Sequence, residues 1–173
     1  MTLEDLIDHE SIRQSLARYA RGIDRQDIEL VIDAYWPEGW DAHGMHEGTA
    51  VEFGAFVSKN WPLLRMHHLL GQSHIELNGA FANVETYFVA HQHVVEGGSE
   101  YVAAGRYEDR FERRSGVWKV LHRVVVFDWR KEWTQSETDA AKLGALPASN
   151  RGSTKADYSW DLFSSKPLRM PVG

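Results

Sequence analysis

HLLGQSHIELNGAFANVETYFVAHQHVVEGG, residues 68–98 of the chain, is the stretch that decides the fold class. It contains two extended segments, about 68–77 and 81–95, separated by the dipeptide Asn78-Gly79. An Asn-Gly pair favours a two-residue hairpin turn because both positions accept a positive φ. The stretch therefore predicts two antiparallel strands joined by a tight turn.

Two further extended segments, about 100–113 and 117–129, continue the same pattern. The short links between consecutive segments predict an antiparallel meander. Alternation along 100–113 indicates that one face of the sheet is buried and the other solvated. The apolar side is formed by Tyr101, Ala103, Tyr107 and Phe111, and the charged side by Arg106, Glu108, Arg110 and Glu112.

The N-terminal part of the chain has helical periodicity instead. Apolar residues recur every three to four positions from Leu3 to Tyr19, again over about 28–35, and again from Thr49 to Trp61, which predicts three helices. A weaker pattern over 40–50 is consistent with a short hairpin. Helices followed by a one-faced antiparallel sheet predict an α+β fold in which the helices pack on a curved sheet and enclose a cavity.

One domain and a tail account for the whole chain. The domain is expected over 1–133, and 134–173 is expected to form an extended arm that packs its aromatic residues, such as Tyr158 and Trp160, on the same or a neighbouring subunit. An outer sheet face and an aromatic arm both favour a homo-oligomer, a dimer or a trimer.

Composition excludes several classes of function. The 173 residues include no cysteine, which removes disulfides, thiol nucleophiles and cysteine-based metal sites. A net charge of −6 argues against a nucleic-acid partner. No apolar run in the sequence is long enough to span a membrane. The acidic N-terminus does not have the character of a signal peptide, so we expect a cytoplasmic protein. Nucleotide-binding motifs are absent from the sequence, so we expect no cofactor.

Four of the nine histidines lie where an interior cavity is expected. His67 and His68 stand at the entrance to the sheet, and His91 and His93 share one strand face with Tyr87. Imidazoles among apolar neighbours are typical of a catalytic pocket, where a neutral histidine acts as a general base. The other five histidines show no such pattern.

Each of these residues also has a structural interpretation. Asp24, the candidate carboxylate that would orient a histidine base, is equally suited to cap the second helix. His67 or His68 suits a satisfied polar position at a strand end. His91 and His93 suit solvent exposure or pairing with carboxylates such as Glu85 or Glu108.

A resemblance to a known family favours the catalytic interpretation. The chain resembles the SnoaL-like group of the nuclear transport factor 2-like superfamily over about residues 3–133. The segments that carry the resemblance are Tyr19-Ala20-Arg21-Gly22-Ile23-Asp24, Met66-His67-His68-Leu69-Leu70-Gly71-Gln72, Ile75-Glu76-Leu77-Asn78-Gly79, Glu85-Thr86-Tyr87-Phe88, Gly105-Arg106-Tyr107-Glu108-Asp109, and Gly116-Val117-Trp118-Lys119-Val120 leading to Asp128-Trp129. The group is similar to scytalone dehydratases, hexachlorocyclohexane dehydrochlorinases and bile-acid 7α-dehydratases.

The resemblance implies a cone-shaped α+β barrel and a set of site residues. It implies that Asp24 orients His68, with His67 as the alternative one residue away, and that this dyad abstracts a proton. It also implies that Tyr19 and His91 assist as acids or hydrogen-bond donors. No catalytic arginine is placed by it. The expected pocket wall comprises Tyr35, Trp36, Phe53, Trp61, His67, Tyr87, His93 and Phe127.

Three functional hypotheses follow from these observations. The first is a cofactor-independent lyase or isomerase, of dehydratase or cyclase type, that acts on a hydrophobic cyclic small molecule. The second is a non-catalytic binding or structural subunit, such as the small subunit of a ring-hydroxylating dioxygenase. The third is a metal site formed by His91 and His93 with His68 or a carboxylate, although two histidines fall short of a usual catalytic set.

Overall fold

The structure is a computed structural model that describes residues 1–134, with side chains described as far as residue 132. Three helices precede most of a six-stranded sheet. The helices are α1 (Leu3–Asp24), α2 (Ile28–Asp33) and α3 (Ala50–Asn60), and the strands are β1 (Tyr35–Ala42), β2 (Glu47–Thr49), β3 (Leu64–Asn78), β4 (Phe81–Val94), β5 (Ser99–Arg114) and β6 (Val117–Thr134). The arm expected over 134–173 lies, apart from its first residue, outside the described residues.

Local signals in the sequence determine where the helices begin. Thr2 and Asp5 form a capping box at α1, and Thr49 and Glu52 form another at α3. Asp27 caps α2 by accepting a hydrogen bond from the backbone N–H of Leu30. Asp24 is therefore not the cap of the second helix and is available for other contacts.

The strands are ordered β2-β1-β6-β5-β4-β3 across the sheet. The meander from β3 to β6 is confirmed, and its turns contain Gly79 and Gly116 with φ values of +63° and +81°. The second helix, however, ends at Asp33, and Tyr35 begins β1, which pairs in parallel with β6. Tyr35 is buried, as the apolar spacing over 28–35 implied, but it belongs to a strand and not to the second helix.

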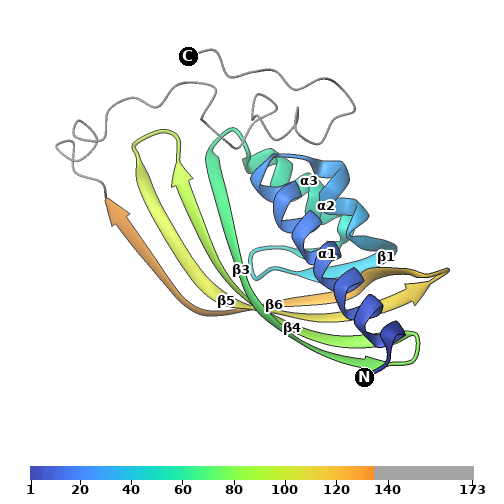
Figure 1. The fold of residues 1–173 in the computed structure, drawn as a ribbon. Helices are drawn as coiled ribbons and strands as arrows, with labels where there is room; N and C mark the ends of the chain where they lie inside the picture. The colour runs from blue at the N-terminus through green and yellow to red at the C-terminus, as the bar shows by residue number, and fades with distance from the viewer. Residues whose placement is uncertain (135–173) are drawn as a thin grey trace, which may run out of the picture.

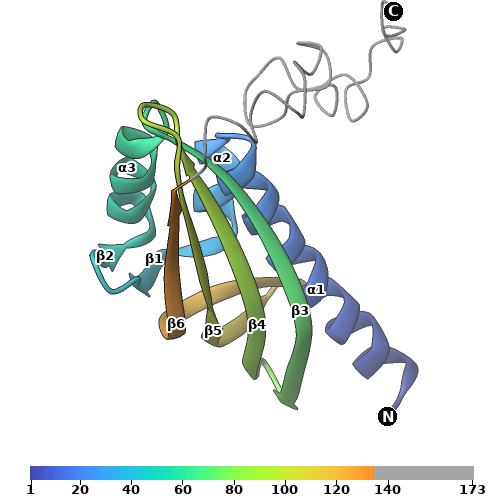
Figure 2. The same cartoon turned by 90° about the vertical axis from the view of Figure 1, so that its left-hand side faces the viewer.

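The sheet is strongly curved and wraps around the helices (Figure 1). Viewed from the side, α1 runs along the β3 edge, while α3 lies across β1 and β2 at the other edge (Figure 2). The inner face of β4 presents Val84, Thr86, Phe88 and Ala90, all of them buried. This arrangement is the cone expected for the fold class, with the helices against its concave side.

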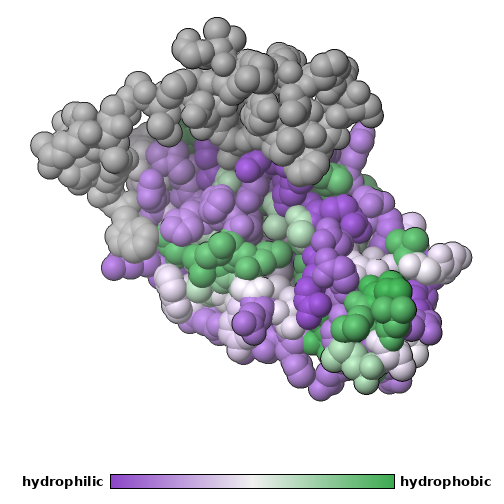
Figure 3. All heavy atoms as spheres, viewed as in Figure 1, coloured by the Kyte–Doolittle hydropathy of each residue, from purple (hydrophilic) through white to green (hydrophobic). Residues whose placement is uncertain are grey.

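The N-terminal part of α1 contains a buried aspartate and, before it, a turn with exposed apolar side chains. Asp8 of α1 is buried and accepts hydrogen bonds from Trp118 Nε1 at 2.8 Å and from Arg113, which ties the helix to β5 and β6. The preceding turn projects beyond the sheet, and its apolar side chains form the green area at the lower right of Figure 3.

Among the described residues, no helix is long and apolar enough to cross a membrane.

Candidate active site

Asp24 and His68 are in direct contact inside the cone. The Nδ1 atom of His68 lies 2.7 Å from Oδ1 of Asp24, and the backbone N–H of His68 donates to Oδ2 at 2.9 Å. The two side chains are only 5% and 9% exposed. Because an ionised carboxylate can only accept a hydrogen bond, Nδ1–H of His68 donates to Asp24, and in the neutral imidazole Nε2 is then the unprotonated nitrogen. Nε2 has no hydrogen-bond partner among the described residues, so it is the atom available as a base.

Local packing positions this pair. Asp24 is the last residue of α1, and the chain turns sharply after it, with the N–H of Asp27 donating to the carbonyl of Gly22 at 2.8 Å. A Cβ atom on Gly22 would lie 2.9 Å from Val31, so glycine is required where α2 folds back onto α1. His68 lies opposite Ala90 in the sheet, and Ala90 lies opposite Ala103. The cross-strand neighbours of His68 on this face are therefore small residues.

The pair borders a groove between α1 and β3. The groove has a volume of ≈ 380 Å³, and both members of the pair line it. The remaining lining residues are Ala17, Ala20, Arg21, Arg25, His67 and Leu70. A small molecule can therefore approach the pair even though both side chains are nearly buried.

A second polar cluster is centred on Arg123 of β6. Its Nε and Nη2 atoms donate to the two carboxylate oxygens of Asp109, each at 2.6 Å, and neither side chain is exposed. The guanidinium carbon lies 4.3 Å from the ring centroid of Tyr19 and 4.2 Å from that of Tyr107. This two-bond geometry and the aromatic faces stabilise a charge that has no water around it.

Burial controls the protonation of both tyrosines. It raises the pKa of Tyr19 and of Tyr107, against the opposing charge of Arg123. Each therefore remains a neutral hydroxyl at physiological pH. The Tyr107 hydroxyl and the Nη1 atom of Arg123 are buried without a hydrogen-bond partner among the described residues, which makes them donors for a group inside the cone.

A second aspartate–histidine pair lies at the C-terminal end of β1. Asp41 is fully buried, accepts a hydrogen bond from Tyr35 Oη at 2.5 Å, and lies 3.0 Å from Nδ1 of His43. Burial alone would raise the pKa of Asp41, but the hydrogen bond to His43 and the nearby charges of His43 and Arg123 lower it overall. The imidazole of His43 stacks on Phe53 with ring centroids 4.7 Å apart.

The residues expected in the pocket wall occupy three kinds of position. Tyr35 and Phe53 are buried in the core beside Tyr19. Phe127 contacts Phe88 edge-on and is about half exposed, as expected for a residue at an opening. Trp61 is half-buried directly after α3, and its carbonyl accepts hydrogen bonds from Gln26 and Arg65.

Trp36 does not contribute to the wall. Its ring lies under the side chains of Arg114 and Lys119, and its Nε1 donates to the carbonyl of Glu112 at 3.0 Å. These contacts lie at the end of β5 where the chain turns into β6. The expectation for Trp36 is therefore wrong: the residue holds β1 to this turn.

The expectation that Tyr87, His91 and His93 face the cavity is also wrong. Phe88 and Ala90 point inward, so the residues of the opposite parity lie on the outer face, where Tyr87 is 52% exposed. His91 is also exposed, and His93 makes a 3.5 Å ion pair with Glu100. Because β4 carries apolar residues on both faces, its sequence alone did not indicate which parity is buried.

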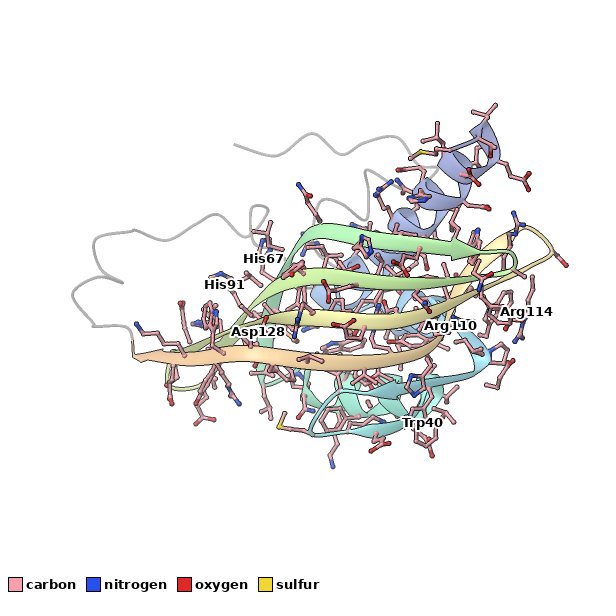
Figure 4. All side chains as sticks on the ribbon, turned by 90° about the horizontal axis from the view of Figure 1, so that it is seen from below. Trp40, His67, His91, Arg110, Arg114 and Asp128 are labelled. Carbon is pink, nitrogen blue, oxygen red and sulfur yellow. The ribbon has the colours of Figure 1, made fainter. Side chains whose placement is uncertain are left out.

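His67 and His91 are directly opposite each other in the β3–β4 register, and Figure 4 labels both on the outer side of the sheet. His68 has the opposite orientation from these two histidines. The metal-ligand set of His91, His93 and His68 is consequently not formed. The described part of the chain contains no group of three His, Cys, Asp or Glu side chains arranged to hold a metal ion.

Sequence reasoning missed five interior polar residues, namely Asp41, His43, Tyr107 as a donor, Asp109 and Arg123. For Asp109 a signal was present, because it shares the parity of Tyr107 and Phe111 and is thus a charge on the apolar face. Such a charge requires a buried partner, which Arg123 supplies. For His43 the signal was its spacing of two residues from Asp41.

The fold and the interior acid–base residues together define a cone-shaped α+β domain with a polar centre. The family model described as SnoaL-like domain matches residues 4–124, and the chain belongs to this family, within the nuclear transport factor 2-like superfamily. No curated protein sequence matches the chain.

Solved structures with the same fold share little sequence with this chain. A hexachlorocyclohexane dehydrochlorinase (LinA type 2) superposes with a TM-score of 0.72 at 18% identity, covering 84% of this chain and 98% of that one. A putative scytalone dehydratase from Novosphingobium aromaticivorans gives 0.71 at 16% identity, covering 79% and 94%. A putative aromatic ring hydroxylase from the same species gives 0.67 at 18% identity, covering 73% and 93%. At these identities the likeness establishes the fold.

Proposed function

We propose that the protein is a cofactor-independent lyase or isomerase that acts on a hydrophobic, cyclic small molecule. The observation that carries the proposal is the buried contact between His68 Nδ1 and Asp24 Oδ1 at 2.7 Å, which leaves Nε2 without a hydrogen-bond partner among the described residues. In this geometry His68 is a general base and Asp24 its positioning carboxylate.

The chemistry assigned to these residues is a proton abstraction. His68 Nε2 takes a proton from carbon next to a carbonyl or a leaving group, and the carboxylate of Asp24 stabilises the imidazolium that forms. Tyr19, Tyr107 and Arg123 stabilise negative charge that develops on the substrate, because all three remain hydrogen-bond donors in a dry interior. His91 has no part in this mechanism because it lies on the outer face.

The aromatic interior supports a hydrophobic cyclic substrate. Phe88 stacks on Tyr107 with ring centroids 4.5 Å apart, and Phe127 meets Phe88 edge-on at 6.0 Å. Phe88 and Tyr107 are buried against each other, so Phe127, which is about half exposed, is the ring of this group that can present an aromatic face to a flat or ring-shaped ligand. Two of the structural neighbours carry the names of elimination enzymes, a dehydrochlorinase and a dehydratase, which supports the same reaction class.

The proposal is tested with 5-nitrobenzisoxazole, a flat apolar compound whose ring opens when a base removes its single acidic carbon-bound proton. Asp24→Asn and His68→Gln should each lower the turnover by about two orders of magnitude or more. The double variant should lose little beyond either single variant, because the residues act as a unit. Wild-type turnover no faster than that of the double variant would contradict the proposal.

A non-catalytic role is the second candidate, and the likeness to a putative aromatic ring hydroxylase favours it. In that case the chain serves as a structural subunit, as the small subunits of ring-hydroxylating dioxygenases do. Co-purification with a larger iron-containing chain, together with no elimination activity, would support this role over the first. We also propose that the protein is cytoplasmic and forms a homo-oligomer. Sedimentation velocity would test the oligomeric state.

A further inference from the structure

The groove that borders Asp24 and His68 continues along α1. A second part of it, with a volume of ≈ 290 Å³, also lies between α1 and β3. Its lining residues are Arg13, Leu16, Ala17, Leu70, Gly71, Gln72 and Ser73. Ala17 and Leu70 line both parts, so the two parts adjoin each other. The groove therefore follows β3, the edge strand of the sheet, where α1 runs beside it (Figure 2).

Positive charge predominates along this groove, although the protein has a net charge of −6. Arg13, Arg21 and Arg25 line it. Among the described residues, the one carboxylate in the lining is that of Asp24, which is already paired with His68. Leucine and alanine side chains supply much of the remaining lining. Such a groove suits an apolar molecule that carries an acidic group.

Two of the arginines flank Ala17 on one side of α1. Arg13 and Arg21 each lie four residues from Ala17, and residues four apart on a helix have Cβ atoms about 5–6 Å apart. Ala17 is exposed and ends at its Cβ atom, so it leaves open surface between the two arginines. Both guanidinium groups are therefore within reach of a group that lies over Ala17.

The spacing between Ala17 and the candidate base suits a ring. Leu70, which lines the groove from the β3 side together with Ala17, lies two residues after His68 on the same face of the strand. Two residues of a strand span about 7 Å. A substituted six-membered ring covers a comparable length, so a ring packed on Leu70 would extend from His68 towards Ala17.

We propose that this groove binds an acidic group of the substrate, with Arg13 and Arg21 donating hydrogen bonds to a carboxylate or a phosphate over Ala17. The inference rests on the proposed function and narrows the substrate class. The substrate is a cyclic molecule whose acidic group lies about one ring length from the carbon that loses its proton. Hydrogen bonds from two guanidinium groups to one anion are charge-assisted and stronger than those between neutral groups.

Structural roles for the arginines are the competing explanation. Arg21 stands in the last turn of α1, where a positive charge stabilises the helix. Arg25 donates to the backbone carbonyl of Asp24 at 3.5 Å, which gives it a structural contact. Arg13 lies about three turns before the end of the helix, so the helix dipole does not account for it. Arg18 of the same helix is exposed and does not line the groove, which makes it a matched control.

The test compares the binding of 2-naphthoate with that of 2-naphthamide, which has the same rings and no charge, by isothermal titration calorimetry. The wild-type protein should bind the acid about tenfold or more tightly than the amide, because hydrogen bonds to a charged group are stronger. Arg13→Gln and Arg21→Gln should each reduce this preference severalfold, whereas Arg18→Gln should not. A parallel titration with 2-naphthyl phosphate distinguishes a phosphate site from a carboxylate site.

A charge introduced at position 17 provides a second test. The carboxylate of Ala17→Asp would pair with the arginines four residues away on either side and would exclude the acidic group of the ligand. Ala17→Asn introduces a side chain of the same size without the charge. The aspartate variant should therefore lose the preference for 2-naphthoate, and the asparagine variant should keep most of it.

The decisive quantity is the ratio of the two dissociation constants within one variant, which does not depend on the fraction of protein that is folded. Neither acid binding more tightly than the amide, or a preference unchanged by both arginine variants, would overturn the inference and leave the Asp24–His68 base in place. 2-Naphthoate should also inhibit the elimination of 5-nitrobenzisoxazole competitively. An acid preference in a protein without elimination activity would instead overturn the proposed function.

Discussion

The two faces of the curved sheet both carry histidine and arginine side chains, but these are buried on the inner face and more exposed on the outer face. On the inner face, His68 is nearly buried against Asp24, and Arg123 is fully buried against Asp109. On the outer face, His91 is exposed, and Arg106 is surrounded by Glu85, Glu108 and Asp128 at 3.2–3.9 Å. The difference teaches that residue type alone does not indicate a site. A carboxylate contact in a dry interior distinguishes the functional candidates from the solvated charges.

The largest expected effect of this difference is on stability. Replacing Arg123 by Met leaves the carboxylate of Asp109 buried without its partner, which should cost about 3–5 kcal/mol of the free energy of unfolding. Replacing Arg106 by Met on the outer face should cost about 1 kcal/mol or less, because its partners remain solvated. Urea unfolding of the two variants measures both values. Similar losses would show that burial does not separate the two faces.

Restoring neutrality in the interior should recover part of that loss. The double variant Arg123→Met with Asp109→Leu removes both charges, so its free energy of unfolding should exceed that of Arg123→Met alone. Chemical denaturation again provides the measurement. A double variant less stable than either single one would mean that packing, and not charge, dominates at this position.

The pH dependence of stability should also follow the inner face. The folded state lowers the pKa of Asp41, so this carboxylate stabilises the fold above its ordinary pKa of about 4, and the contribution is lost as the pH falls through the lowered value. Asp41→Asn should therefore reduce the loss of stability between neutral and acidic pH. Unfolding midpoints measured across that range, with the exposed Glu76→Gln as a control, test the sign.

The smallest expected effect is on the outer face of β4. Tyr87→Ser and His91→Gln replace exposed side chains that lie away from the dyad, so each should change the elimination rate by less than about twofold. A marked loss of activity in either variant, with the melting temperature unchanged, would place part of the site on the outer face.

Features of the fold that neighbouring residues specify were predicted from the sequence, whereas features that depend on distant segments were not. The meander followed from local chemistry, since the Asn78-Gly79 turn and the alternation along β5 are specified within a few residues. The hairpin expected over 40–50 is confirmed by the pairing of β1 with β2, but the parallel pairing of β1 with β6 was missed because it joins segments far apart in the chain. The parity of β4 was ambiguous because Phe88 and Val89 are both apolar.

The candidate site divides in the same way. Asp24 and His68 were recognised through short motifs, but only the folded chain shows that His68, and not His67, meets the carboxylate. The partners of Asp109 and Asp41 depend on long-range packing, so no local pattern identified them as a network. Spacing and parity indicated the candidates, and tertiary contacts selected among them.

The adjacent histidines of β3 test the central claim most directly, because they differ by one residue in position and by one face of the sheet. The measurement is the rate of 5-nitrobenzisoxazole elimination by His68→Gln and by His67→Gln at matched melting temperature. The account predicts a loss of about a hundredfold or more for His68→Gln, which removes the base, and a much smaller loss for His67→Gln, which lines the groove without contacting Asp24. Equal losses in the two variants, or a greater loss for His67→Gln, would contradict it.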